Sequence, residues 1–160
     1  ATPGDKLYVS GTLGDAAAAL AFLEGDWQPE AKIGEYLLNR FYRPDSRLEL
    51  GCSLLHTATS AIDISDGLLA DATHVAHASG CGLNIRSGLL PLSHALQSHS
   101  DGDQALTWAL TGGDDYELLV TLPADCPAPA SLTCIGEVMA GEGVHCDFEV
   151  QKSAGYRHFQ

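Results

Sequence analysis

The chain has 160 residues, of which 45 % are hydrophobic and 18 % are charged, and this is enough for one domain with its own core. Its 21 acidic and 8 basic side chains give a net charge of −13. This charge argues against nucleic acid and anionic membrane surfaces as partners, because contacts with phosphate groups need Lys and Arg.

The first half of the chain is predicted to be mainly helical. A strand at 6–10 precedes an Ala/Leu-rich helix at 16–24, which Asp15 is placed to cap. Helices follow at 30–41 and 47–55. A strand at 59–64 then leads into a helix at 67–79, and Gly80 is expected to end that helix.

The second half is richer in predicted strands. A strand at 81–86 is followed by short helices at 94–97 and 104–110, and then by strands at 116–122 and 132–138. The last strand, at 144–150, is expected to be the hairpin partner of 132–138 at a sheet edge. Strands mixed with helices in this order predict an α/β (α+β layered) fold, with a mixed β-sheet packed against helices in a single domain over 1–160.

The most informative feature is the junction between the strand at 59–64 and the helix that follows it. Side chains alternate along a strand, so Asp63 and Ser65 should share the face opposite the neighbouring isoleucines, and Asp66 follows in the turn. Free N–H groups at the start of a helix favour anions such as phosphate. Carboxylates repel phosphate, however, and need a divalent cation between them, usually Mg²⁺. Asp63 and Asp66 are therefore candidate Mg²⁺ ligands.

A purely structural explanation of this junction also exists. Ser and Asp are common helix N-caps, so Ser65 and Asp66 could be caps and nothing more. Asp63 favours the metal site, because a carboxylate inside an apolar strand costs free energy unless it is paired or binds metal.

A second acidic turn covers residues 112–117, with the sequence Gly-Gly-Asp-Asp-Tyr-Glu. The two glycines allow positive φ and close backbone approach, and Asp114 and Asp115 open the strand that follows. Gly and Asp are also standard turn residues, so the turn by itself does not require a site. Both acidic turns lie at strand ends, which is where α/β folds place their sites.

Two weaker patterns carry less information. Asp71, His74 and His77 are spaced for one face of a helix, where we expect a solvated acid–base pair rather than a metal site. The Gly-rich turn at 11–15 resembles a phosphate-cradling loop, but it lacks the Lys of a Walker loop.

The cysteines and the first residues indicate the context of the chain. Five cysteines form no CxxC pair, so we expect reduced, buried thiols in a cytoplasmic protein and no zinc site. The chain begins Ala-Thr-Pro-Gly-Asp, without an initiator Met or a signal-peptide pattern, and no apolar run approaches the roughly 20 residues of a membrane span. This start is typical of a chain that begins partway through a longer protein.

Six short motifs occur in order along nearly the whole chain, and together they resemble the C-terminal half of the thiamine-monophosphate kinase family. They cover residues 9–17, 40–44, 61–68, 112–118, 134–136 and 155–159. The Asp-x-Ser-Asp-Gly turn alone recurs in the wider superfamily of aminoimidazole-ribonucleotide-synthetase-like enzymes. The Gly-Gly-Asp-Asp-Tyr-Glu turn and the Gly-Tyr-x-His-Phe ending resemble the thiamine kinase itself.

The resemblance implies a site and a reaction. It implies ATP-dependent phosphorylation of thiamine monophosphate to thiamine diphosphate. It also implies that Asp63 and Asp66 bind Mg²⁺, that Ser65 contacts ATP, and that Asp114 and Tyr156 contact the thiamine substrate. The residue chemistry agrees, because phosphoryl transfer depends on positioning and cations, and an aromatic face favours a cationic thiazolium ring.

The resemblance also implies what lies outside the 160 residues. The family has an N-terminal domain that supplies further Mg²⁺ ligands, most of the ATP site and the homodimer interface, so we expect this chain alone to be inactive. Two alternatives remain open from the sequence. One is another ATP-dependent member of the superfamily, such as a selenophosphate synthetase or a hydrogenase-maturation protein. The other is a non-catalytic acidic binding domain.

Overall fold

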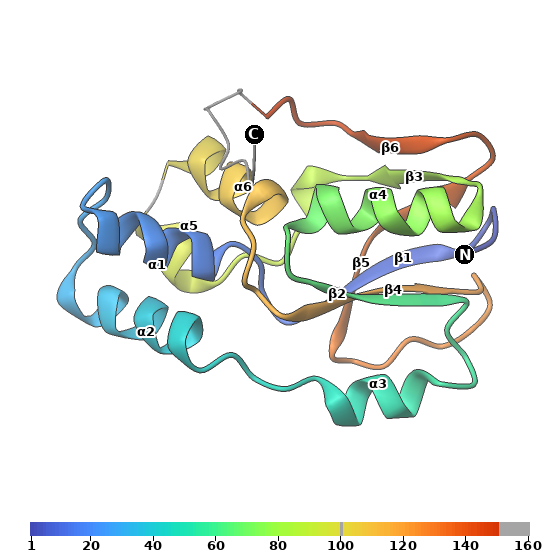
Figure 1. Ribbon diagram of the computed structural model, residues 1–160, viewed down its shortest axis with the longest axis horizontal. Helices are drawn as coiled ribbons and strands as arrows, with labels where there is room; N and C mark the ends of the chain where they lie inside the picture. The colour runs from blue at the N-terminus through green and yellow to red at the C-terminus, as the bar shows by residue number, and fades with distance from the viewer. Residues whose placement is uncertain (100, 151–160) are drawn as a thin grey trace, which may run out of the picture.

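The structure is a computed structural model that describes residues 1–99 and 101–150 (Figure 1). The prediction for Tyr156 lies outside the described residues. The elements are, in order, β1 (Lys6–Ser10), α1 (Asp15–Glu24), α2 (Ala31–Tyr42), α3 (Leu48–Leu54), β2 (Ser60–Ile64), α4 (Leu68–Ser79), β3 (Gly82–Ile85), the 3-10 turn η1 (Ser87–Leu89), α5 (His94–His99), α6 (Gly102–Thr111), β4 (Glu117–Leu122), β5 (Leu132–Met139) and β6 (Gly143–Cys146).

The described strands form one six-stranded sheet in the order β2-β4-β1-β5-β3-β6. Every neighbouring pair is antiparallel except β3 and β6, which are parallel. The sheet is therefore mixed, as predicted. The last strand does lie at an edge, but the predicted hairpin with β5 is wrong, because β3 lies between β5 and β6.

Side chains alternate between two faces of this sheet, as the strand period requires. In β4, Leu119 joins the main core under α4, while Val120 and Leu122 face the opposite side. On that side α3 supplies Leu54, together with the connector that follows β4. Figure 1 shows α4 lying across one face of the sheet and α3 on the far side of β2.

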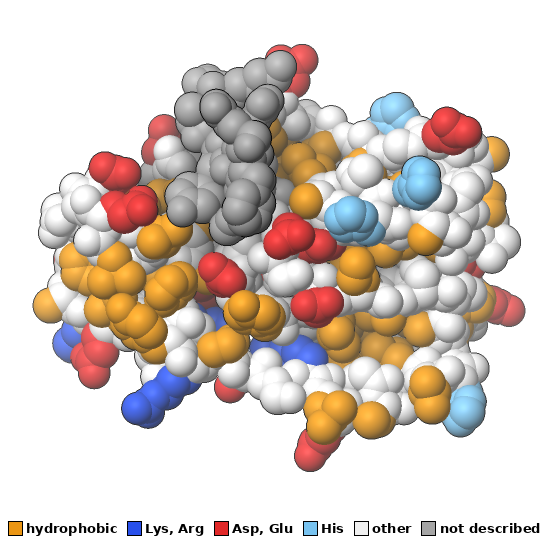
Figure 2. Space-filling model, in the orientation of Figure 1, with side chains coloured by type: hydrophobic (Ala, Val, Ile, Leu, Met, Phe, Trp, Pro, Cys, Tyr) orange, Lys and Arg blue, Asp and Glu red, His pale blue; other side chains and the backbone are white. Residues whose placement is uncertain are grey.

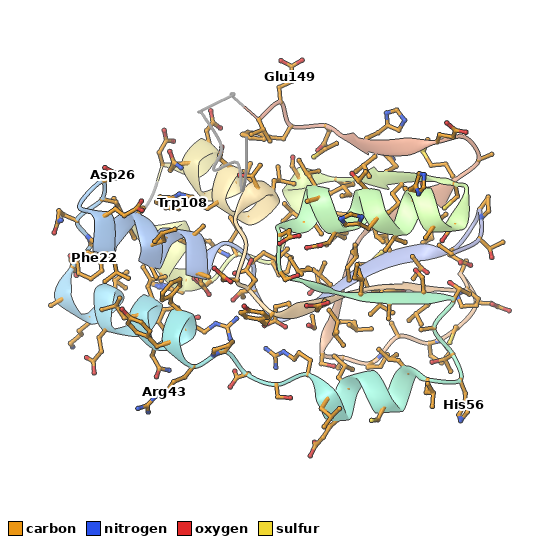
Figure 3. The ribbon with its side chains drawn as sticks, viewed as in Figure 1. Phe22, Asp26, Arg43, His56, Trp108 and Glu149 are labelled. Atoms are coloured by element: carbon orange, nitrogen blue, oxygen red, sulfur yellow. The ribbon has the colours of Figure 1, made fainter. Side chains whose placement is uncertain are left out.

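The remaining helices form a cluster of their own at one end of the sheet (Figure 1). α1, α2, α5 and α6 contribute a small core built from alanines and leucines. Trp27 and Trp108 pack against this core with their ring centroids 5.3 Å apart in a tilted arrangement. Figure 3 shows Trp108 on α6, near the loop that carries Asp26 at the end of α1. None of the described helices is long and apolar enough to cross a membrane.

The structure corrects two further expectations. Only Cys81 is buried among the five free cysteines, and Cys52 and Cys134 are exposed. Asp15 does not cap α1: the N-cap position is Gly14, which has no side-chain cap, and Asp15 is the first residue inside the helix. The predicted end of α4 is confirmed, since Gly80 adopts a left-handed φ of 62° and its N–H bonds back to the last turn.

Candidate functional site

Backbone hydrogen bonds join the two acidic turns. The N–H of Asp114 donates to the carbonyl of Ser65 at 3.0 Å, and the N–H of Tyr116 donates to the carbonyl of Ile64 at 2.9 Å. The turn after α6 is thereby fixed against the end of β2. The close approach explains Gly113, because a Cβ there would overlap the Ser65 carbonyl oxygen. Figure 2 shows acidic side chains gathered on this part of the surface.

Asp63, Asp66 and Asp114 are all exposed at this junction. No ion pair among the described residues involves any of the three. The expectation that Asp63 is enclosed by an apolar strand is wrong, because β2 is an edge strand and only Ile64 on its other face is fully buried. What distinguishes Asp63 is its position among other carboxylates, which repel one another unless a cation binds.

Asp71 has a structural part in this junction. It is 2 % exposed, and its Oδ2 accepts the N–H groups of Ser65 and Asp66 at 3.0 and 3.1 Å. The predicted solvated helix face is therefore wrong for Asp71. Burial raises the pKa of Asp71, and the negative charges of Asp66 and Asp63 add to that shift, although the two N–H bonds oppose it. Asp71 holds the turn so that its neighbours point outward.

The donor atoms at this junction suit a hard cation. Asp66, Asp71 and His74 bring one ligand atom each to within 4.8 Å of one another, whereas His77 is not in the group. Mg²⁺ prefers carboxylate and water oxygens and keeps several waters, so Asp63 and Asp66 with open solvent around them fit this ion. Ser65 is half-buried beside these carboxylates, and its backbone N–H is held by Asp71.

The second acidic turn alternates between the surface and the interior. Asp114 and Tyr116 are exposed, whereas Asp115 and Glu117 are 3 % and 1 % exposed. Asp114 and Tyr116 also have positive φ angles of 65° and 53°. Left-handed backbone costs about 1–2 kcal/mol for a residue with a side chain, so the buried carboxylates have to hold the turn in place.

Asp115 ties the turn to the start of α1. Its carboxylate accepts the N–H of Gly14 at 2.8 Å and the N–H of Ala16 at 3.5 Å, so it is the residue that caps this helix. Burial raises the pKa of Asp115 to about 7, although the two N–H bonds and the Arg40 charge lower it. Asp115 thus connects the acidic turn with the Gly-rich turn at 11–14.

Glu117 is the centre of a buried ion-pair network. Arg47 binds it through Nε and Nη2, both at 2.6 Å, and Arg40 Nη2 lies 3.0 Å away. Ser10 Oγ also donates to the carboxylate and in turn accepts the N–H of Leu118 at 2.9 Å. Burial alone would raise the pKa of Glu117, but the bonds from Arg47, Ser10 and Arg40 outweigh it and hold the pKa below its ordinary value.

Asp15 forms a second buried anchor beside this network. It is fully buried and accepts hydrogen bonds from Thr12 Oγ1 at 2.9 Å, Ser93 Oγ at 2.5 Å and the Tyr36 hydroxyl at 3.2 Å. Arg40 Nε lies 3.8 Å from its Oδ2. The Gly-rich turn is therefore fixed through its own acidic residue, and nothing in its geometry requires a phosphate.

A groove opens next to the acidic residues, between α3 and the edge strand β2. It encloses about 660 Å³. Asp63 and Tyr116 are among its lining residues, and its exposed lining is mostly apolar, with Arg47 held in the wall by Glu117. The groove, the open strand edge and the exposed carboxylates therefore form one continuous surface.

Sequence reasoning missed the anchoring roles of Asp71, Asp115 and Glu117. Their partners are side chains and N–H groups that only the folded chain brings near, up to 107 positions away for Ser10 and Glu117. Only Asp71 had a local signal, because an acidic residue in the first turn of a helix can reach back to N–H groups at its start.

Comparison with known proteins places this chain in a family. The family described as "AIR synthase related protein, C-terminal domain" matches residues 2–146. Thiamine-monophosphate kinase of Escherichia coli (strain K12) is 43 % identical over 179 residues, covering 99 % of this chain and 54 % of that protein. The chain therefore spans about half the length of that curated relative.

Solved structures agree in fold and in extent. The crystal structure of thiamine-monophosphate kinase from Stenotrophomonas maltophilia K279a has a TM-score of 0.83 at 40 % identity and covers 94 % of this chain and 52 % of that chain. AaThiL complexed with AMPPCP and TMP has a TM-score of 0.86 at 38 % identity, with 99 % and 52 % covered. The chain belongs to the AIR synthase related proteins, whose C-terminal domain it carries.

Proposed function

We propose that this chain is the C-terminal domain of a thiamine-monophosphate kinase, which transfers the γ-phosphoryl group of ATP to thiamine monophosphate. The observation that carries the proposal is the backbone contact between Asp114 and Ser65, which joins the two acidic turns in one surface where Asp63, Asp66 and Asp114 are exposed. The resemblance to thiamine-monophosphate kinases and to a structure complexed with AMPPCP and TMP supports the choice of substrates.

Each residue has a proposed part in this reaction. Asp63 and Asp66 bind Mg²⁺, Ser65 contacts ATP, and Asp114 and Tyr156 contact thiamine monophosphate. A bound Mg²⁺ neutralises the charge of the transferring phosphoryl group. The support for these parts is the exposure of the three aspartates and the absence of any ion pair to them among the described residues. Tyr156 rests on the resemblance alone.

The remaining parts of the proposal also rest on the resemblance. We infer that the protein is cytoplasmic, and that it forms a homodimer through an N-terminal half which also supplies most of the ATP site. The length of the relatives supports such a second half, since this chain covers 54 % of the Escherichia coli protein.

The test is enzymatic and uses an enzyme of the relatives' full length that carries this chain. We expect it to form thiamine diphosphate from thiamine monophosphate and ATP, to stop when EDTA removes Mg²⁺, and to recover when Mg²⁺ is restored. Asp114→Asn should raise the KM for thiamine monophosphate more than that for ATP, because it removes a charge that faces the thiazolium cation. Binding of both substrates without any diphosphate product would contradict the kinase and favour the non-catalytic alternative.

A further inference from the structure

We propose that Tyr116 is a further substrate-binding residue, whose aromatic face meets the cationic thiazolium ring of thiamine monophosphate in the groove between α3 and β2. This inference rests on the proposed function and extends it. It adds to the site a residue that the sequence analysis left without a role, and it gives the groove an occupant, the ring system of an organic cation.

The first support is the way in which the backbone presents this side chain. Tyr116 is 44 % exposed and has a φ of 53°, a conformation that bulky residues rarely adopt. Its N–H is fixed on the Ile64 carbonyl, and the buried carboxylates of Asp115 and Glu117 anchor the residues on either side. The fold therefore holds an aromatic ring on the surface against its conformational preference.

The second support is the contact between Tyr116 and Asp114. The Tyr116 hydroxyl donates to Asp114 Oδ1 at 3.0 Å, which orients the ring and leaves Oδ2 available. This hydrogen bond and the negative charge of Asp114 raise the pKa of Tyr116. The phenol is the donor in this contact, because a carboxylate only accepts hydrogen bonds. A carboxylate and an aromatic ring are thus presented together, as cation recognition requires.

The third support is the charge around the ring. Asp63 and Asp66 contribute negative potential at Tyr116, as Asp114 does. When Mg²⁺ occupies the first two, the charge of Asp114 remains, because it is not among the proposed metal ligands. This environment favours a ring with a fixed positive charge over a neutral ring such as adenine, and it repels a free anion.

The fourth support is the groove itself. Tyr116 lines it together with Asp63. The lining also includes the apolar side chains of Leu48, Leu55 and Leu118 and the charged side chains of Asp45 and Arg47. An organic cation with a flat ring system combines a positive charge with apolar surface, so it matches a groove of about 660 Å³ that offers carboxylates beside apolar side chains.

The experiment compares an aromatic with an aliphatic replacement in the full-length enzyme. Tyr116→Leu removes the π-face but keeps an apolar side chain, whereas Tyr116→Phe keeps the ring and loses only the hydroxyl. We expect the leucine variant to raise the KM for thiamine monophosphate about two- to thirtyfold, with the KM for ATP changed less than about twofold. The phenylalanine variant should change both by less than about twofold. Tyr42→Leu is the matched control, since Tyr42 is 64 % exposed at the end of α2 and does not line the groove.

Several outcomes would overturn the inference. An unchanged KM for thiamine monophosphate in the leucine variant would exclude a contact between Tyr116 and this substrate. A rise only in the KM for ATP would mean that the Tyr116 ring contacts the nucleotide instead. Equal rises in the KM for thiamine monophosphate in both variants would mean that the effect comes from losing the Tyr116 hydroxyl, which donates to Asp114, and not from losing the ring. If the leucine variant fails to fold, judged by its melting temperature, Tyr116→Met replaces it as the aliphatic variant, with the same expected rise in the KM for thiamine monophosphate and the same overturning result.

Direct binding separates this inference from the proposed function. Calorimetric titration with thiamine monophosphate, without ATP, measures the affinity of the wild type and of both variants whether or not turnover occurs. A wild-type enzyme that binds thiamine monophosphate but forms no diphosphate contradicts the proposed function. The affinities of the variants then still show whether Tyr116 contacts this ligand. A wild-type enzyme that does not bind the ligand contradicts both.

Discussion

Single residues in the turn after α6 divide into those that hold it and those that it presents. Asp115 and Glu117 point inward, to the start of α1 and to two arginines, while Asp114 and Tyr116 point outward. Replacing an outward residue should therefore change ligand binding, and replacing an inward one should change folding stability. This division makes the roles experimentally separable.

The proposed metal ligands, Asp63 and Asp66, also point outward, so replacing them should change ligand binding more than folding stability. In the full-length enzyme, Asp63→Asn and Asp66→Asn should each lower turnover at a fixed Mg²⁺ concentration by at least about tenfold. Both residues are exposed and repel each other, so the free energy of unfolding should fall by no more than about 0.5 kcal/mol, or rise. Asp125→Asn, at an exposed position on the connector after β4, is the control. Variants that melt far lower yet keep their turnover would show that the two aspartates are structural caps.

Asp115 should make stability depend on pH. Burial raises its pKa to about 7 in the folded state, whereas the unfolded chain releases this proton near pH 3.8. At this group the unfolded state therefore binds fewer protons between these values, so the contribution of Asp115 to the free energy of unfolding falls as pH rises from about 4 to about 7 and is level above. Asp115→Asn removes the titration, and its amide oxygen can still accept the Gly14 N–H.

The measurement is urea unfolding of wild type and Asp115→Asn over this pH range. We expect the variant to lose less stability than the wild type between about pH 5 and about pH 8, because the titrating group is gone. Parallel pH profiles for the two proteins would mean that Asp115 keeps an ordinary pKa despite its burial.

The candidate site residues could be predicted from the sequence more reliably than their burial and their partners in the fold. Asp63, Asp66 and Asp114 were found from residue type and strand-end position, and the structure brings all three to one junction. The burial of Asp63 was predicted wrongly, because exposure depends on whether the strand is at an edge. The cap on α1 was missed since Asp115 lies 101 positions from Gly14.

At the scale of elements, Glu117 joins three parts of the chain. It is the first residue of β4, and its partners are Arg40 at the end of α2 and Arg47 just before α3. The segment between these helices lines the groove and is therefore fixed to the sheet through one carboxylate. Removing that charge leaves two largely buried guanidinium groups without their main partner.

Glu117→Gln should consequently destabilise the fold by about 3–5 kcal/mol at neutral pH, as expected when one partner of a buried ion pair is removed. Because the pKa of Glu117 lies below its ordinary value, the stabilisation is present above that value and is lost as pH falls through the folded pKa, so the two proteins should converge in acid. Glu137→Gln is the matched control, since the side chains of its ion pair with Lys6 are 38 % and 40 % exposed and the pair should contribute little. Chemical denaturation measures both. Equal losses in the two variants would contradict the central place of Glu117.

The elements themselves were largely predictable, because hydrophobic periodicity is a local property. Strand 6–10 and the helix now described as Leu68–Ser79 lie within a residue of their predicted bounds. The order of strands was not predictable in the same way. Whether residues 143–146 pair with β5 or with β3 depends on which strand occupies the neighbouring place in the sheet, and both arrangements satisfy the same local pattern.

At the scale of the whole molecule, the described part of this domain presents exposed carboxylates beside a largely apolar groove. The two arginines that contact its second acidic turn, Arg40 and Arg47, are both ion-paired with Glu117. ATP carries several negative charges that must be neutralised by cations and N–H donors held in place together. A complete nucleotide site therefore needs ligands beyond the ones described here.

We accordingly expect the 160-residue chain alone to fold but not to catalyse phosphoryl transfer. The folding follows from the sheet, whose two faces are covered by α4 and by α3 with the connector after β4. The inactivity follows because phosphoryl transfer fails when part of the cation and phosphate ligand set is missing. The check is to incubate the purified chain with ATP, Mg²⁺ and thiamine monophosphate, beside the full-length enzyme and a protein-free blank. A circular dichroism melt of the same preparation establishes that the chain is folded. Thiamine diphosphate formed by the folded chain above the blank would mean that these residues carry a complete active site.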